Sequence, residues 1–119
     1  MRKDLNMRKG KMIAQGAHAA LGIFAQEMEI QDNNIAEVSL WPEAIEWLTG
    51  SYAKVCVGVD SKQELLDIYE AAKALELPRI LIHDNGTTEF GGVTTVTCCA
   101  IGPHKYDLID QVTGHLKLL

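Results

Sequence analysis

The pattern that most constrains the fold is an amphipathic helix between two short apolar runs. Residues 53–59 are rich in valine and predict a strand, and residues 79–83 are apolar enough to predict a buried central strand. Between them, Ser61 and Glu64 have the spacing of a capping box, which starts a helix. A strand, a helix and a strand in this order predict a right-handed βαβ unit. We therefore expect an α/β fold.

Hydrophobic periodicity and turn residues predict the remaining elements. We expect helices at about 11–28, 42–48, 62–76 and 104–112, and further strands at 1–5, 94–101 and 115–119. Residues 29–40 are polar and are expected to form a loop. A chain of 119 residues suits one domain, so we expect residues 1–119 to form a single mixed sheet of four to five strands with helices on its faces.

The helix expected at about 11–28 carries an apolar stripe among many small residues. The members of this stripe recur at helical spacing: Ile13, Ala17, Leu21, Phe24 and Met28. That spacing places them on one face, which we expect to face the core. The alanines and glycines of the same segment keep the helix thin, which allows close approach to a sheet or to a partner helix.

Basic residues are concentrated at the start of the chain, although the formal net charge is -5. The acidic balance argues against a protein that coats nucleic acid without specificity. Five basic side chains nevertheless lie close together in the sequence: Arg2, Lys3, Arg8, Lys9 and Lys11. Such a patch can hold phosphates on an otherwise acidic protein. The alternative interpretation is a solvated terminus without a ligand.

The apolar runs and the cysteines bear on where the chain acts. No run approaches the length of a membrane span, and no apolar run follows the basic start as in a signal peptide. Cys56, Cys98 and Cys99 lie in β-like runs, so we expect reduced thiols and a cytoplasmic protein. Adjacent strand cysteines point to opposite faces, and neither glycine-rich nucleotide-binding motif is present. We therefore expect neither a metal nor another cofactor.

Two groups of polar residues are candidates for chemistry. Lys11, Gln15 and His18 fall at spacings of four and three, which places them on one helix face near its start. Asp84 directly follows a predicted strand, in a turn with Gly86, at the edge of the sheet where α/β proteins bind ligands. Each group also has an ordinary structural interpretation, as a polar helix face and as an Asp-x-Gly turn.

Four ordered sequence blocks together resemble the type II peptidyl-tRNA hydrolases. The first is Arg2 to Lys11 with the following Ala-Gln and His-Ala-Ala. The second is Asp84-x-Gly86-x-Thr88, and the last two are Ala-Ile-Gly-Pro at 100–103 and residues 107–118. These blocks cover nearly the whole chain, with a divergent part at about 26–52.

The resemblance implies a mixed sheet flanked by helices, a homodimer, and metal-independent hydrolysis of the ester between a peptide and the 3′ end of tRNA. It implies catalytic roles for Lys11, Asp84, Thr88 and Thr97, with Thr94 and Thr95 as alternatives for the second hydroxyl. Gln15 and His18 would hold Lys11 in place. Phosphate contacts would come from the basic residues Arg2, Lys3, Arg8 and Lys9, with Lys54 or Lys105 as additions.

The expected mechanism uses one charge of each sign. Asp84 would orient a water or accept its proton, the threonine hydroxyls would fix that water, and Lys11 would stabilise the oxyanion. Two other functions remain open. The chain could be a catalytically silent homologue that binds RNA or a protein, or it could be an esterase or amidohydrolase of a smaller acyl conjugate.

Overall fold

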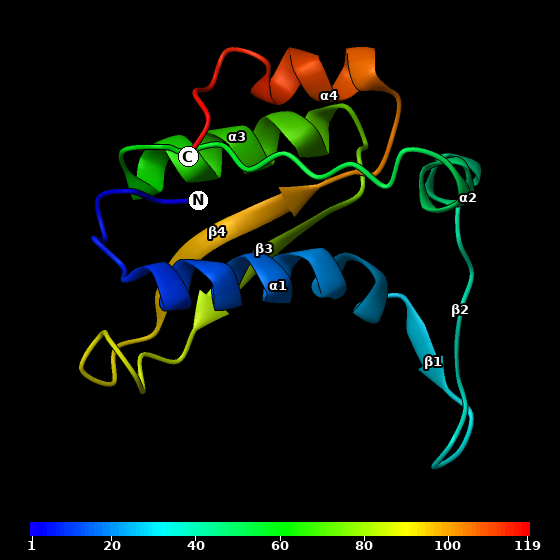
Figure 1. Ribbon diagram of the computed structural model, residues 1–119, viewed down its shortest axis with the longest axis horizontal. Helices are drawn as coiled ribbons and strands as arrows, with labels where there is room; N and C mark the ends of the chain where they lie inside the picture. The colour runs from blue at the N-terminus through cyan, green and yellow to red at the C-terminus, as the bar shows by residue number, and fades with distance from the viewer.

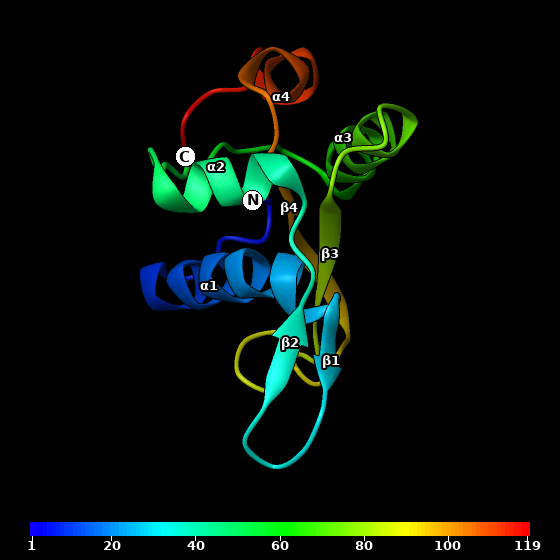
Figure 2. The same cartoon turned by 90° about the vertical axis from the view of Figure 1, so that its right-hand side faces the viewer.

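An antiparallel pair of strands, β3 (Arg79–Asp84) and β4 (Thr95–Ile101), forms the centre of the fold in a computed structural model that describes residues 1–119. Helix α1 (Lys9–Ala25) packs on one face of this pair, and α3 (Lys62–Ala74) packs on the other (Figures 1 and 2). Helix α4 (Tyr106–Thr113) lies beside α3. The α/β class predicted from the sequence is therefore confirmed.

The predicted sheet of four to five strands is not confirmed. The structure contains two sheets of two strands each, and residues 1–3, 57–59 and 117–119 add only isolated bridges and single main-chain hydrogen bonds. Arg2 N donates to Thr97 O at 3.0 Å, for example, and Gly58 N donates to Lys117 O at 3.0 Å. Residues 53–56 are all exposed, so the valine-rich run overstates the strand, and the predicted βαβ unit lacks a regular first strand.

The predicted core stripe of α1 is wrong for four of its five residues, and only Phe24 is half-buried. Ile13 is 72% exposed and Leu21 is 64% exposed, whereas Gln15, Ala19 and Ile23 are buried against the sheet. Gly22 shows why this face turns inward, because a Cβ atom there would lie 2.8 Å from Cδ1 of Ile80. The small residues thus let α1 approach β3 closely, as the sequence predicted, but Ile13 and Leu21 remain outside.

Residues 29–40 were expected to form a loop, and this prediction is also wrong in part. Strands β1 (Met28–Ile30) and β2 (Ala36–Val38) form an antiparallel hairpin that extends away from the rest of the molecule (Figure 1). Asp32 organises its turn, because its Oδ1 atom accepts hydrogen bonds from the backbone N–H groups of Asn34 and Ile35. Helix α2 (Pro42–Thr49) follows at nearly its predicted bounds.

Of the two contacts in the capping box predicted for α3, the contact between the Ser61 side chain and the Glu64 backbone forms. Glu64 N donates to Ser61 Oγ at 3.1 Å, while the Glu64 carboxylate accepts from Asp60 N at 2.6 Å. The predicted ends of α1, α3 and α4 differ from the observed ends by one to three residues, because the last turn of a helix depends on local contacts. No helix combines the length and the apolar character that a membrane crossing requires.

Candidate active site

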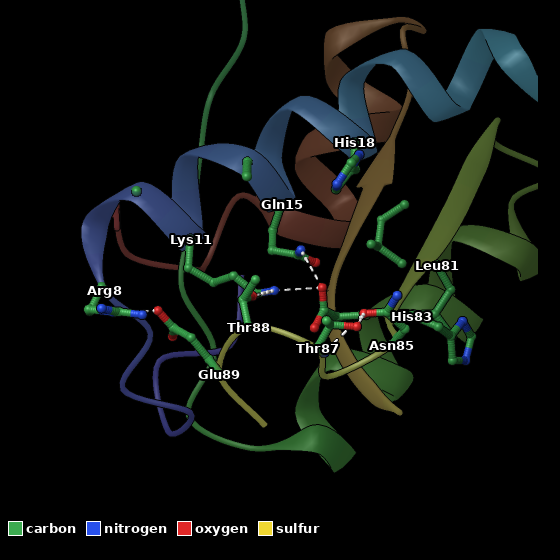
Figure 3. A pocket seen from close by; sticks show the side chains of 14 residues that line it. Arg8, Lys11, Gln15, His18, Leu81, His83, Asn85, Thr87, Thr88 and Glu89 are labelled. Carbon is green, nitrogen blue, oxygen red and sulfur yellow. Dashed lines mark hydrogen bonds and ion pairs between the residues drawn. The ribbon is translucent and has the colours of Figure 1, made fainter. Parts of the chain in front are cut away.

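A polar cleft opens where the start of α1 faces the end of β3 and the loop that follows it. Its volume is about 1120 Å³, and only three of its 14 lining residues are hydrophobic. Lys11, Gln15 and His18 enter the lining from α1, and Thr88 enters from the loop after β3 (Figure 3). Asp84, the last residue of β3, lines the same cleft. The two groups of polar residues that the sequence places far apart therefore share one cleft.

The centre of the cleft is a contact between an ammonium and a carboxylate. Lys11 Nζ lies 2.7 Å from Asp84 Oδ1, and both side chains are 11% exposed. The same Nζ atom donates to Thr88 Oγ1 at 2.7 Å and lies 5.5 Å from the centre of the Phe90 ring. Lys11 is therefore held by an anion, a hydroxyl and an aromatic face inside an open cleft.

Asp84 is held in one orientation by three donors. Lys11 Nζ and Gln15 Nε2 both donate to Oδ1, the latter at 3.1 Å, and Gly86 N donates to Oδ2 at 2.9 Å. The turn needs a glycine, because Gly86 has a φ of +79° and a Cβ atom there would clash with Val93 O. The Lys11 hydrogen bond, with smaller contributions from Gly86 and Gln15, outweighs desolvation and holds the pKa of Asp84 below its ordinary value.

Gln15 and Thr97 form a buried support behind this carboxylate. Gln15 is 1% exposed and Thr97 is 0% exposed, and the Thr97 hydroxyl donates to Gln15 Oε1. This contact turns the amide nitrogen toward Asp84. Gln15 was expected to hold Lys11, but it holds Asp84 instead. Thr97 was expected to fix a water in the cleft, but it is buried behind Gln15 and does not line the cleft. The spacing of Gln15, Ala19 and Ile23 was the sequence signal for a buried face that includes this amide.

The remaining predicted residues are less closely engaged. His18 is exposed and lines the cleft, but it makes no hydrogen bond to Lys11. Of the alternative threonines, Thr94 is exposed in the loop, and Thr95 donates to Val93 O at 2.9 Å. Neither one lines the cleft.

The basic patch divides into two parts. The Arg2 side chain is 11% exposed, because it pairs with Asp4 at 2.6 Å and donates to Val96 O, so it braces the chain start against β4. Lys3 pairs with Asp60 at 3.0 Å. Lys9 is exposed and without a partner, and the 80% exposed Arg8 lies at the cleft, where its Nε atom is 2.7 Å from Glu89 Oε1. The sequence interpretation missed Glu89, for which no spacing signal existed.

The thiols lie apart from the cleft chemistry. Cys98 is 2% exposed and donates to Gln15 O at 3.5 Å, and burial raises its pKa. Burial also raises the pKa of Cys99 to about 11, so neither thiol is an available nucleophile at neutral pH. No three His, Cys, Asp or Glu side chains gather into a group that could hold a metal ion.

This arrangement suits the hydrolysis of an ester or a related acyl bond. Hydrolysis needs a group that orients or deprotonates water and a positive charge where the oxyanion develops. Asp84 and Lys11 supply one of each within a single open cleft. Thr88 adds a hydroxyl at the same point, and Gln15 fixes the carboxylate from behind.

Comparison with known proteins identifies the family. The family model described as Peptidyl-tRNA hydrolase PTH2 matches residues 1–119. The chain is 44% identical over 120 residues to the peptidyl-tRNA hydrolase of Methanocaldococcus jannaschii, with 100% of this chain and 95% of that protein covered. It is 42% identical over 119 residues to the peptidyl-tRNA hydrolase of Methanopyrus kandleri, with 100% of this chain and 93% of that protein covered.

The class defined by the fold and the cleft is therefore that of a hydrolase. The chain belongs to the peptidyl-tRNA hydrolase PTH2 family, as its sequence resemblance indicated. Residues at about 26–52, which the four sequence blocks do not include, contain the hairpin and α2, beyond the C-terminal end of α1 (Figure 1).

Proposed function

We propose that this enzyme hydrolyses the ester between a peptide and the 3′-terminal ribose of tRNA. The observation that carries the proposal is the Lys11–Asp84 contact of 2.7 Å in an open polar cleft, beside the exposed cations Arg8 and Lys9. Relatives that align along the whole chain bear the name peptidyl-tRNA hydrolase. The cleft supplies the two charges that ester hydrolysis needs, and the cations beside it suit a substrate with a phosphate backbone.

In the proposed reaction, Lys11 and Asp84 separate as the substrate enters. The water oxygen attacks the ester carbonyl carbon and gives its proton to Asp84, while Lys11 Nζ stabilises the developing oxyanion and Thr88 orients the water. The bond between the carbonyl carbon and the ribose oxygen then breaks, and Asp84 returns the proton to that oxygen. The hydrogen bond from Lys11 is the main cause of the low pKa of Asp84. When Lys11 turns to the oxyanion, the pKa of Asp84 rises, and the carboxylate becomes a better base for the proton of the water.

Gln15 and Thr97 serve this reaction as positioning residues. Thr97 fixes the amide of Gln15, and Gln15 donates to the same Oδ1 atom that Lys11 contacts. When Lys11 turns toward the substrate, Gln15 and Gly86 still hold the carboxylate in place. The water would therefore meet a carboxylate whose orientation is already set, which lowers the cost of reorganisation during reaction.

The tRNA contacts are proposed to be led by phosphates. Arg8 lines the cleft and the exposed Lys9 follows it in the chain, while Arg2 and Lys3 are not among the lining residues. Affinity should fall steeply with salt, because bound phosphates release counterions. A cytoplasmic location, one functional domain over 1–119, and hydrolysis without a metal or other cofactor stay predictions of this proposal.

We also propose that the enzyme acts as a homodimer. Ile13 and Leu21 lie on the outer face of α1 and are 72% and 64% exposed, with the small residue Ala17 between them. Large apolar side chains on one helix face are commonly covered by a partner, and the alanines and glycines of α1 would let a second helix approach closely. A second copy of the chain is the proposed partner because the resemblance to the type II peptidyl-tRNA hydrolases implies a homodimer.

One alternative substrate is favoured by a specific observation. Because Arg2 and Lys3 do not line the cleft and Arg8 is paired with Glu89, fewer free cations surround the cleft than the sequence suggested. This is compatible with an esterase of a smaller acyl conjugate, which needs little positive charge. The test is release of tRNA from N-acetylated aminoacyl-tRNA by the purified enzyme, compared with hydrolysis of a small N-acyl amino ester. Preference for the small ester would overturn the tRNA proposal, and turnover of neither would favour a silent binding homologue.

A further inference from the structure

Glu89 makes a contact at the cleft that the proposed reaction does not use. Its Oε1 atom lies 2.7 Å from Nε of Arg8, and the pair links the residue before α1 to the loop after β3 (Figure 3). The two side chains differ greatly in exposure, at 80% for Arg8 and 13% for Glu89. Both residues line the cleft. A shielded carboxylate therefore holds one edge of an exposed guanidinium.

The atoms in this contact determine which nitrogen atoms of Arg8 remain free to bind a ligand. Glu89 engages Nε alone, and the two Nη atoms of Arg8 have no hydrogen-bond partner. A guanidinium is planar, so fixing its Nε edge also fixes the direction of its Nη edge. Two parallel N–H groups on that edge match two oxygens of a phosphate. Arg8 thus presents a fork of free donors at the cleft, in an orientation set by Glu89.

The shielding of Glu89 matters because a free carboxylate beside a polyanion would repel it. Its 13% exposed side chain is directed to Arg8, and the guanidinium neutralises it. An ion pair with one highly exposed partner contributes little to folding, so stability alone gives a weak reason for the contact. Orientation of Arg8 is the effect that this geometry produces best.

We propose that Glu89 is a positioning residue, which fixes Arg8 so that its Nη edge binds a backbone phosphodiester of the substrate. The inference rests on the proposed function, because it presupposes a nucleic-acid substrate. The rival interpretation of the same contact is a latch, in which Glu89 competes with the phosphate for Arg8. The two differ in sign: removal of a positioning residue weakens binding, whereas removal of a latch strengthens it.

The test compares Glu89→Ala, which removes the acceptor, with Glu89→Gln, which keeps an acceptor oxygen and removes the charge. We expect Glu89→Ala to raise both KM for N-acetylaminoacyl-tRNA and Kd for uncharged tRNA roughly three- to tenfold, with kcat unchanged. Glu89→Gln should stay at the wild-type values or below them. Glu29→Ala, an exposed acid of β1, is the matched control for net charge and should not raise either constant.

Two further measurements separate phosphate contact from a general change in the cleft. On an N-acetylaminoacyl ester of adenosine, which has the scissile bond but no phosphate, Glu89→Ala should have no effect. In the Arg8→Gln background, Glu89→Ala should not raise the Kd for uncharged tRNA any further. An unchanged or lowered Kd in Glu89→Ala, or an equal effect on the phosphate-free ester, overturns the inference. If the wild type hydrolyses neither substrate, the proposed function fails, and the Kd comparison still decides the role of Glu89.

Discussion

The residues on the two faces of α1 recur at similar helical spacing, but one face is buried and the other is exposed to solvent. On the inner face, Gln15, Ala19 and Ile23 are buried, while on the outer face Ile13 and Leu21 remain largely exposed. The inner face thus contains a buried polar amide beside Ala19 and Ile23, while two large apolar side chains of the outer face stay in contact with solvent. Periodicity therefore identifies a helix but not its buried side. Close approach to the sheet selects the face with small residues, and the buried amide is tolerated because both of its ends are bonded.

The largest expected effect concerns the residues that the inner face supports. Lys11→Ala and Asp84→Ala should each lower kcat for N-acetylaminoacyl-tRNA on the order of a hundredfold or more, because each removes a charge on which the transition state depends. Release of tRNA under saturating substrate measures this, and circular dichroism checks that each variant is folded. Near wild-type turnover in both variants would contradict the roles proposed for them.

A matched pair of substitutions tests the two faces directly. Gln15→Leu removes the hydrogen bond from the Thr97 hydroxyl and the hydrogen bond to Asp84. It leaves the buried Thr97 hydroxyl without a partner, so it should lower the free energy of unfolding by about 1–3 kcal/mol. It should also reduce kcat. Ile13→Ser, two positions earlier on the outer face, should change the unfolding free energy of the isolated chain by less than about 0.5 kcal/mol.

Urea unfolding of both variants at a chain concentration low enough to favour the monomer measures this difference. A larger loss for Ile13→Ser than for Gln15→Leu would show that the outer face, rather than the inner one, carries the packing of α1.

The outer face should instead control assembly. Leu21→Glu places a charge where we expect the partner, so it should shift the mass in sedimentation equilibrium from the dimer to the monomer. An exposed charged residue on a helix surface has little effect on the folded monomer itself. Glu70→Leu on α3 serves as a control that changes surface polarity elsewhere on the chain. A wild-type chain that is monomeric at all concentrations would remove the dimer proposal.

The smallest expected effect is a dependence of stability on pH that Asp84 contributes. Its pKa is lower in the folded chain than in the unfolded chain, where it lies near the ordinary value. The stabilisation is therefore complete above the unfolded pKa and is lost as the pH falls through the folded pKa. Between pH 6 and pH 3, Asp84→Asn should lose less unfolding free energy than the wild type. Equal losses in denaturant titrations would show that the Lys11 contact does not favour the charged carboxylate.

Local sequence determined most of the helices and the polar residues of the cleft, but not the strand pairing. Hydrophobic periodicity and helix start and stop signals predict α1, α2 and α3 close to their observed bounds, because these signals act within a few residues. The positions of Lys11, Gln15 and Asp84 were named as candidates from their spacing and their place beside a strand. The family was recognised from four short blocks and is shown by the comparison along the whole chain.

Only the tertiary structure decided how these parts meet. It turned Gln15 toward Asp84 rather than Lys11, placed Thr97 behind the amide, and engaged Arg2 in bracing the chain. It also brought Glu89 to Arg8 from 81 residues away. The physical reason is that a side chain's partner depends on packing between distant segments. Hydrophobic period specifies a face, but the distance between helix and sheet decides which face is buried.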